Sequence, residues 1–289
     1  MTDHLSHPHG FRQWAEQHRG EFDAVVFDVD GVLMRGDALP GAVKTVERLR
    51  ADGVLLALLS NDGSHSAEER CRSLAKRGIH FRPEEFVSSS DGLVELVAER
   101  NLKGRRVFVA GKLGNPCYAT QAGLRVTRNL AELPDCGGVI LGEEEYDWEE
   151  TINAIVNFFI GRPDALLMVP NCDSHFRTRS GGVRLAPGAV AHLVTFMLDQ
   201  CHVGLSPIFL GKPHQPIFEH VHHTLEQRAG RELNRERVLI VGDSLQSDIR
   251  GGNDFGYRTA LVLTGVTDLD MLKRSAIEPD LIFDVLDST

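Results

Sequence analysis

The chain has 289 residues, 42% of them hydrophobic and 25% charged, which is typical of a globular protein with one large domain or two modest ones. Its formal net charge of -10 argues against nucleic acid as a partner, because phosphate backbones attract basic surfaces. No apolar run approaches the length of a membrane span, and the five scattered cysteines include no CxxC pair, so we expect a cytoplasmic protein with reduced thiols, no zinc site and no membrane contact.

The first apolar run ends in two acids. Residues 11–19 have the pattern of a short amphipathic helix, and Ala24 to Phe27 then read as a buried strand. Asp28 would stand at the carboxyl end of that strand, where open α/β sheets bind their ligands. Alternate residues of an extended chain point the same way, so Asp28 and Asp30 can approach one site unless the chain turns between them. Paired carboxylates suit a cation such as Mg²⁺, and a carboxylate beside a metal can attack phosphorus; the alternative is that both are ordinary turn residues.

The next strand ends in polar residues. Val54 to Leu59 predict a strand, and Ser60 and Asn61 follow it. A hydroxyl and free backbone amides at such a strand–helix junction can hold phosphate oxygens. Helical patterns at 41–52 and 65–77 flank this strand, and the alternation predicts a doubly wound parallel sheet.

A second α/β unit interrupts this pattern. A short strand at 86–90 and a helix at 91–100 precede it, and the strand–helix alternation then restarts. The unit is roughly 80 residues long, enough for a small domain. We therefore predict a core domain of residues 1–101 and 185–289, with residues 102–184 as an inserted domain. The elements expected in the insert are strands at 107–110, 124–126, 138–141 and 165–169 and helices at 115–122 and 148–160.

The core pattern is expected to resume with a helix from Gly188 to Asp199. Lys212 follows a further apolar stretch, and Val238 to Val241 predict a strand that leads into Asp243, with Asp248 shortly after it. A lysine ammonium can offset the charge of a phosphoryl group, and additional acids suit a hard cation. The alternative is that Lys212 is solvated and that Asp243 only caps the next helix.

These residues occur in the order DxD, Ser, Lys and GDSxxxD, each where a strand is expected to end. The ordered set resembles the haloacid dehalogenase superfamily of phosphohydrolases, and residues 22–78 and 187–268 carry the resemblance. The DGVLMRG start, Pro40-Gly41-Ala42 ahead of a helix, and Asn171-Cys172-Asp173 ahead of Pro187-Gly188-Ala189 are similar to its NagD-like branch. The resemblance implies an α/β fold, with a doubly wound, Rossmann-like parallel-sheet core and an inserted α/β cap of the C2 type.

The resemblance also implies roles for the core residues. Asp28 would be the nucleophile and Asp30 the general acid/base of a phosphatase that works through an aspartyl-phosphate. Mg²⁺ would be bound by Asp28, Asp30 and Asp243, with Asp30 contributing its backbone carbonyl. Lys212 would be a third catalytic residue that stabilises charge. The remaining implied roles are phosphate binding by Ser60, Asn61 and Lys212 and support of the metal site by Asp248.

The loop from Asn171 to Gly182 is the expected specificity element of the cap, because loops carry function disproportionately. A cap of this size restricts entry to small molecules, so a small phosphorylated metabolite is the expected partner. The loop matches no particular substrate class and leaves the substrate open. Its candidate specificity residues are Asn171, Asp173, His175, Arg177 and Arg179.

Other activities fit the same residues. An aspartyl-phosphate can pass its phosphoryl group to an alcohol, which would make the chain a phosphotransferase. A non-catalytic scaffold that binds small molecules would not need Asp28 and Asp30, and both are present, which favours an enzyme. Cap-mediated homodimers occur among similar proteins, so a homodimer is a further expectation.

Overall fold

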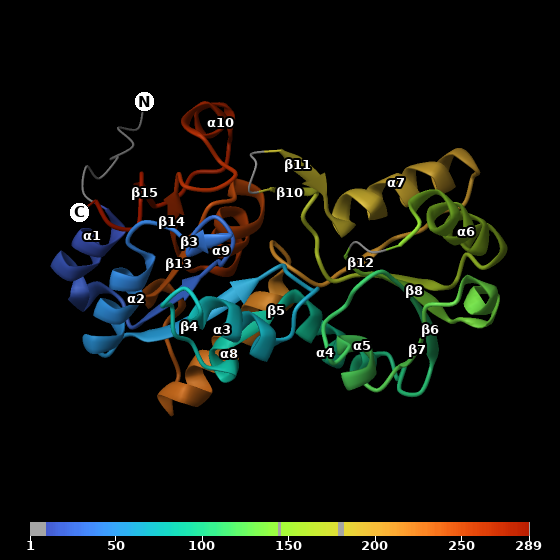
Figure 1. The fold of residues 1–289 in the computed structure, drawn as a ribbon, viewed down its shortest axis with the longest axis horizontal. Helices are drawn as coiled ribbons and strands as arrows, with labels where there is room; N and C mark the ends of the chain where they lie inside the picture. Colours follow the sequence, from blue (N-terminus) through green and yellow to red (C-terminus); the bar gives the residue numbers. More distant parts are fainter. Residues whose placement is uncertain (1–9, 144–145, 179–181, 289) are drawn as a thin grey trace.

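The computed structural model describes residues 10–143, 146–178 and 182–288, and these residues form two parallel β-sheets, each layered between helices (Figure 1). The amino-terminal and carboxyl-terminal segments build one half together, and the middle of the chain builds the other. This arrangement confirms the predicted α/β class with parallel sheets. Within the described residues, no helix combines the length and the apolar character needed to cross a membrane.

The first sheet has six strands, and all of them are parallel. The amino-terminal and carboxyl-terminal segments contribute three strands each, which meet where β1 pairs with β13. In spatial order the strands are β15 (Leu281–Phe283), β14 (Arg258–Val262), β13 (Val238–Gly242), β1 (Ala24–Phe27), β4 (Leu55–Ser60) and β5 (Phe86–Ser88). One face is covered by α1 (Phe11–Gln17), α2 (Ala42–Ala51) and α3 (Ala67–Ala75), the other by α8 (Gln215–Ala229) and α9 (Arg250–Phe255). The short helix α10 (Leu269–Arg274) lies near the end of the chain.

Continuous apolar runs become the central strands of this sheet. All four residues of β1 are buried, as expected for a parallel strand covered on both faces. The helix that follows β4 begins at Ser66, whose hydroxyl accepts a hydrogen bond from the backbone of Glu69 while the Glu69 carboxylate accepts one from the backbone of Ser66. This capping box fixes where α3 starts, and so limits the loop between β4 and α3 to a few residues.

The second sheet has five parallel strands, drawn from the middle of the chain. In spatial order they are β12 (Ile208–Phe209), β9 (Leu166–Val169), β8 (Gly138–Leu141), β6 (Arg106–Ala110) and β7 (Arg125–Thr127). Apolar residues of α4 (Gly92–Glu99) and α5 (Tyr118–Gln121) pack on one face, and those of α6 (Trp148–Gly161) and α7 (Pro187–Gln200) on the other.

Two predicted helices belong to a different sheet than expected. The helices predicted at 91–100 and at Gly188–Asp199 both form, as α4 and α7, but their apolar faces pack on the second sheet instead of the first. The apolar stretch before Lys212 becomes β12 at the edge of the same sheet. These three elements lie outside the residues 102–184 that the sequence predicts for the inserted domain. The exact domain boundaries remain a prediction, and we propose that the inserted unit, called the cap below, runs from α4 to about residue 210.

The remaining elements are short. Two antiparallel ribbons form, β2 (Met34–Arg35) with β3 (Asp37–Ala38) and β10 (His175–Arg177) with β11 (Val183–Leu185), and the second is drawn between the two halves in Figure 1. Short 3₁₀ helices are η1 (Arg19–Glu21), η2 (Pro83–Glu85), η3 (Ser89–Asp91), η4 (Leu130–Asp135) and η5 (Arg235–Arg237), and η6 (Leu245–Ile249) is a short π-helix.

Candidate active site

The carboxyl edge of the first sheet gathers the predicted core residues. Asp28 follows β1 and Asp243 follows β13, and these two strands are neighbours in the sheet. Lys212 and Asp248 come from the segments before α8 and within η6. All four side chains are buried. The structure therefore brings together residues that lie up to 220 positions apart in the sequence, as the strand-end pattern predicts.

Lys212 ties two of these acids together. Its Nζ donates hydrogen bonds to Asp28 Oδ1 at 2.6 Å, to Asp248 Oδ1 at 2.7 Å and to the Leu59 carbonyl at 2.8 Å. Burial alone would lower the pKa of the ammonium, but the charges of Asp248 and Asp28 outweigh burial and raise this pKa above its usual range. The ammonium therefore stays charged, with all three protons donated.

Asp243 is held against two glycines. A Cβ placed on Gly31 would lie 2.3 Å from Asp243 Oδ2, and one placed on Gly265 would lie 1.6 Å from it. Gly31 also has a φ of +95°, which side chains rarely adopt. The Val266 amide donates to the same carboxylate oxygen at 2.7 Å. The backbone thus leaves room for this carboxylate only because both positions lack a side chain.

Three carboxylates of this cluster fit a hard cation. Oxygens of Asp28, Asp243 and Asp248 all lie within 4.8 Å of one another, in the part of the chain that the structure describes. Burial raises the pKa of Asp28 to about 6 against the opposing charge of Lys212, and burial with the charges of its acidic neighbours raises that of Asp243 well above its usual range. One ammonium does not balance three buried carboxylates, and an oxygen-only donor set suits Mg²⁺.

Ser60 and Asn61 lie beside Lys212. The Asn61 amide nitrogen donates to the Lys212 carbonyl at 3.0 Å, and the Lys212 amide donates to Asn61 Oδ1 at 2.8 Å. This reciprocal pair holds the backbone that carries the ammonium. The Ser60 hydroxyl accepts a hydrogen bond from the Asp62 amide at 3.1 Å, which leaves its own proton available to a ligand. Phosphate binding by these residues stays a prediction.

Asp30 does not join the cluster. The chain turns directly after β1, with the Leu33 amide donating to the Val29 carbonyl at 3.0 Å. As a result the Asp28 carboxylate is buried, whereas the Asp30 side chain is 56% exposed and forms an ion pair with Arg70. The turn that the sequence leaves open therefore separates the two side chains. The acid/base role of Asp30 stays a prediction, as does its backbone contribution to a metal site.

Two residues of the predicted specificity loop have polar partners inside the protein. Asn171 Nδ2 donates to Glu143 Oε1 at 2.8 Å, and its Oδ1 accepts from the Asp173 amide at 2.9 Å. Burial raises the pKa of the Asp173 carboxyl, while the charge of Lys212 and a hydrogen bond from Asn61 oppose the rise. Asp173 of the cap thus lies next to the core cluster.

Two of the other three predicted loop residues lie on the strand β10. His175 begins β10, is exposed, and shares a hydrogen bond of 2.9 Å with the Ser174 hydroxyl. Arg177 ends β10, where it is paired with Val183 of β11. Arg179 lies outside the described residues. Their roles in specificity stay predictions.

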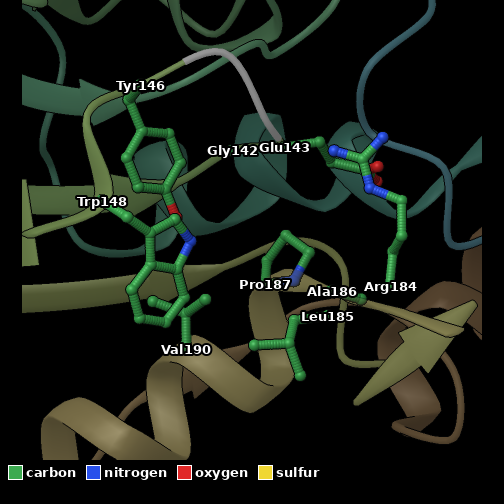
Figure 2. A pocket seen from close by; sticks show the side chains of 9 residues that line it. All are labelled: Gly142, Glu143, Tyr146, Trp148, Arg184, Leu185, Ala186, Pro187 and Val190. Carbon is green, nitrogen blue, oxygen red and sulfur yellow. The ribbon is translucent and has the colours of Figure 1, made fainter.

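The cap also contains a pocket, close to the end of β8. Its volume is about 300 Å³. Figure 2 shows the rings of Tyr146 and Trp148 on one side of this pocket and the side chains of Glu143 and Arg184 on the other. The remaining lining residues are Gly142, Leu185, Ala186, Pro187 and Val190.

The sequence reasoning misses two charged residues beside the site. Glu143 lies two residues beyond β8, and the strand-end rule that predicts Asp28 could have found it. Its carboxylate accepts a long hydrogen bond, of 3.4 Å, from the Gly63 amide of the core. Arg70 lies in the middle of α3, where no feature of the sequence indicates which side chain its guanidinium meets.

Comparisons with known proteins agree with this geometry. A family model described as haloacid dehalogenase-like hydrolase matches residues 25–125, and one described as HAD-hydrolase-like matches residues 209–289. The first match contains Asp28, and the second contains Lys212 and Asp243. The matched segments therefore include the ends of the chain that build the first sheet.

Similar proteins cover nearly the whole chain. Ribonucleotide monophosphatase NagD of Escherichia coli is 28% identical over 261 residues, 90% of this chain and 94% of that protein. Glycerol-3-phosphate phosphatase of Rattus norvegicus is 29% identical over 288 residues, 91% of this chain and 85% of that protein. The solved structure of a possible sugar phosphatase from Cytophaga hutchinsonii has a TM-score of 0.82 at 27% identity, covering 95% and 97% of the two chains.

The fold and the buried acid–lysine cluster define an α/β hydrolytic enzyme whose site lies at the carboxyl edge of a parallel sheet. The chain belongs to the haloacid dehalogenase superfamily, in its NagD-like branch, and is a phosphoric monoester hydrolase.

Proposed function

We propose that the chain is a Mg²⁺-dependent phosphatase that hydrolyses a small phosphate monoester through an aspartyl-phosphate on Asp28. One observation carries this proposal. Asp28 is buried at the end of β1, and its Oδ1 accepts a hydrogen bond from Lys212. Carboxylate oxygens of Asp28, Asp243 and Asp248 lie within 4.8 Å of one another. A carboxylate in this setting has a free oxygen to attack phosphorus and a fixed positive charge beside the reacting group.

In the first step, the free oxygen of Asp28 forms a bond to phosphorus as the bond from phosphorus to the leaving oxygen breaks. Asp30 supplies the proton that the leaving alkoxide needs. The positive charge of Lys212 stabilises the phosphoryl oxygens, and the hydroxyl of Ser60 donates a hydrogen bond to one of them, where charge must be stabilised in phosphoryl transfer. Asn61 contributes by holding the Lys212 backbone.

In the second step, water attacks the phosphorus of the aspartyl-phosphate. Asp30 takes the proton of this water, which returns Asp30 to its starting state and releases inorganic phosphate and free Asp28. A closed cap would exclude other water from the reacting group. Asp173 of the cap, whose carboxyl interacts with the charge of Lys212, is placed to take part in that closure, and Asn171 accepts a hydrogen bond from its amide at 2.9 Å.

The residues fit a magnesium ion. Asp28 and Asp243 would hold it with carboxylate oxygens, and Asp248 would support them, because its Oδ2 accepts hydrogen bonds from the Asp243 amide at 3.1 Å and the Ser244 amide at 3.0 Å. When bound, Mg²⁺ supplies positive charge that offsets the carboxylates and orients the phosphate.

The proposed substrate class is a small phosphorylated metabolite. The two curated relatives are named for ribonucleotides and for glycerol 3-phosphate, which share a phosphate ester and differ in the group that carries it. The cap pocket of about 300 Å³, with two aromatic rings and two charged side chains, suits a polar group of metabolite size. A cytoplasmic location and a homodimer stay predictions.

A phosphate-release assay tests the proposal. The purified chain is incubated with p-nitrophenyl phosphate and with a panel of phosphorylated metabolites, with and without Mg²⁺. We expect Mg²⁺-dependent release of inorganic phosphate. A phosphotransferase would consume substrate faster when an alcohol acceptor is added and would form the phosphorylated alcohol. Absence of turnover on every substrate would contradict the proposal and favour a binding scaffold.

A further inference from the structure

Asp30 is held by a buried arginine instead of by the cluster around Asp28. Its side chain is 56% exposed, yet its carboxylate forms an ion pair with Arg70, whose own side chain is only 10% exposed. An exposed aspartate without such a partner would sample several rotamers. The orientation of this carboxylate is therefore set by a group inside the protein.

Arg70 is itself anchored at its other side. Its Nε lies 3.2 Å from Asp62 Oδ2, an ion pair without hydrogen-bond geometry. Asp62 accepts hydrogen bonds from the Ser64 hydroxyl at 2.6 Å, from the Ser64 amide at 2.8 Å and from His65 Nδ1 at 2.8 Å. Asp62 therefore has a fixed position in the loop between β4 and α3. A planar guanidinium between two carboxylates is attracted to both, which restricts its orientation and so the direction in which it meets the second carboxylate.

The guanidinium also lies within electrostatic reach of Asp28. Burial lowers the pKa of Arg70, and the charges of Asp28 and then of Glu143 oppose that effect. The cation that holds Asp30 is thus close enough to the proposed nucleophile for the two charges to interact.

The loop that anchors Arg70 is in contact with the cap. The Tyr118 hydroxyl of α5 donates to the His65 carbonyl at 3.0 Å, and the Gly63 amide donates to Glu143. Both contacts fall on residues 63–65, next to Asp62.

We propose that Arg70 is a positioning residue that orients the Asp30 carboxylate for proton transfer, with Asp62 fixing the guanidinium. This rests on the proposed phosphatase function. A general acid must come within hydrogen-bond distance of the leaving oxygen, so loss of its orientation lowers the rate without removing the acid. Arg70 acts through Asp30, and therefore has no separate effect when Asp30 cannot transfer a proton.

A double-mutant cycle tests this coupling. The variants are Arg70→Ala, Asp30→Asn and the double variant, assayed with Mg²⁺ on phenyl phosphate and p-nitrophenyl phosphate. We expect Arg70→Ala to lower kcat/KM for phenyl phosphate by about tenfold, since general acid–base catalysis is worth roughly 10²- to 10⁴-fold in total. The loss on p-nitrophenyl phosphate should be smaller, because p-nitrophenolate leaves without protonation. In the Asp30→Asn background, Arg70→Ala should change the rate by less than about twofold.

Arg228 provides a matched control. Its side chain is 17% exposed, and it donates hydrogen bonds to the buried Glu85 carboxylate at 2.8 Å and to the Leu56 carbonyl at 2.5 Å, with no contact to Asp30. Arg228→Ala should lower the melting temperature at least as much as Arg70→Ala and leave the ratio of the two substrates unchanged. If Arg70→Ala does not fold, Arg70→Lys keeps the charge but loses the fork that can reach two carboxylates, and should show the same substrate ratio.

The outcomes separate the two proposals. An active wild-type chain in which the Arg70 and Asp30 effects multiply independently would overturn the positioning role while leaving the phosphatase intact. An increase in rate on removing Arg70 would also overturn it, because the arginine would then restrain Asp30 away from the substrate. A wild-type chain that releases no phosphate would instead contradict the proposed function itself.

Discussion

The carboxyl ends of the two sheets carry acids in very different settings. At the first sheet, Asp28, Asp243 and Asp248 are buried, and each accepts hydrogen bonds from groups of the core itself. At the cap sheet, part of Glu143 is exposed, although its carboxylate lies deep enough for burial to raise its pKa. It lies on a pocket whose wall includes Trp148, which is 42% exposed.

The two settings suit two different functions, stabilisation of charge and selection among substrates. A preorganised cluster stabilises charge at the reacting atoms, and it needs the same geometry for every phosphate ester. A more open pocket with mixed aromatic and charged walls can select among leaving groups. We call the carboxyl edge of the first sheet the core edge and that of the cap sheet the cap edge. We therefore expect changes at the core edge to affect all substrates alike, and changes at the cap edge to alter their ranking.

The largest expected effect comes from the core edge. Asp28→Asn keeps the shape of the side chain but removes the attacking charge, so kcat should fall by about 10³-fold or more on every substrate. The measurement is phosphate release across the panel. Asp254→Asn, which changes a mostly exposed aspartate of α9, serves as the control. Retention of more than about a tenth of the activity by Asp28→Asn would contradict covalent catalysis.

Removal of the metal should also affect every substrate. Chelation with EDTA is expected to lower the rate by about 10²-fold or more, because the cluster would lose the charge that offsets its carboxylates, and Mg²⁺ should restore the rate. A binding measurement adds a second readout: Mg²⁺ should raise the melting temperature of the wild type, and by much less in Asp243→Asn. Full activity after exhaustive chelation would remove the metal from the mechanism.

The sequence could predict the core edge because its signals are local. A buried parallel strand reads as an apolar run, so the position of Asp28 or Asp243 at a strand end is visible in a few residues. Parallel strands then bring these ends to one edge without further information. The same reasoning could not settle the turn after Asp28, which depends on whether the next two residues continue the strand.

Features that depend on tertiary packing could not be predicted. The helical patterns of α4 and α7 show an apolar face but not which sheet that face meets; the sequence pattern groups both with the first sheet, whereas their apolar residues pack on the second. The partner of Arg70 likewise follows from how α3 packs beside the turn at Asp30. A long flexible side chain carries no sequence signal for its partner, unlike an acid at a strand end.

In the predicted specificity loop, replacing the two arginines should change the substrate ranking. Arg177→Ala with Arg179→Ala is expected to change the ratio of kcat/KM between metabolites and p-nitrophenyl phosphate by about tenfold, because the generic substrate needs only the phosphate contacts. The measurement is this ratio across the panel, with Arg100→Ala, an exposed residue just after α4, as the control. An unchanged ratio would assign the arginines to solvent or to a subunit contact, and an equal loss on all substrates would place them in the chemistry.

The smallest expected effect concerns the stability of the cap edge. Burial raises the pKa of Glu143 from 4.5 to about 7, with nearby Asp62 adding to the rise and the hydrogen bond from Asn171 opposing it. Between these two pH values the folded chain binds more protons at Glu143 than the unfolded chain, so the contribution of Glu143 to stability falls as pH rises and is lowest above about 7.

Glu143→Gln keeps an oxygen that can accept a hydrogen bond from Asn171 but does not ionise. The melting temperature of this variant relative to wild type should therefore rise by a few degrees, about 2–4 °C, between pH 5 and pH 8. Glu149→Gln, at an exposed position early in α6, should show no such trend. Parallel melting curves for Glu143→Gln and wild type would mean that this carboxylate is already ionised at pH 5, and the pocket would then carry a negative charge at Glu143 throughout this pH range.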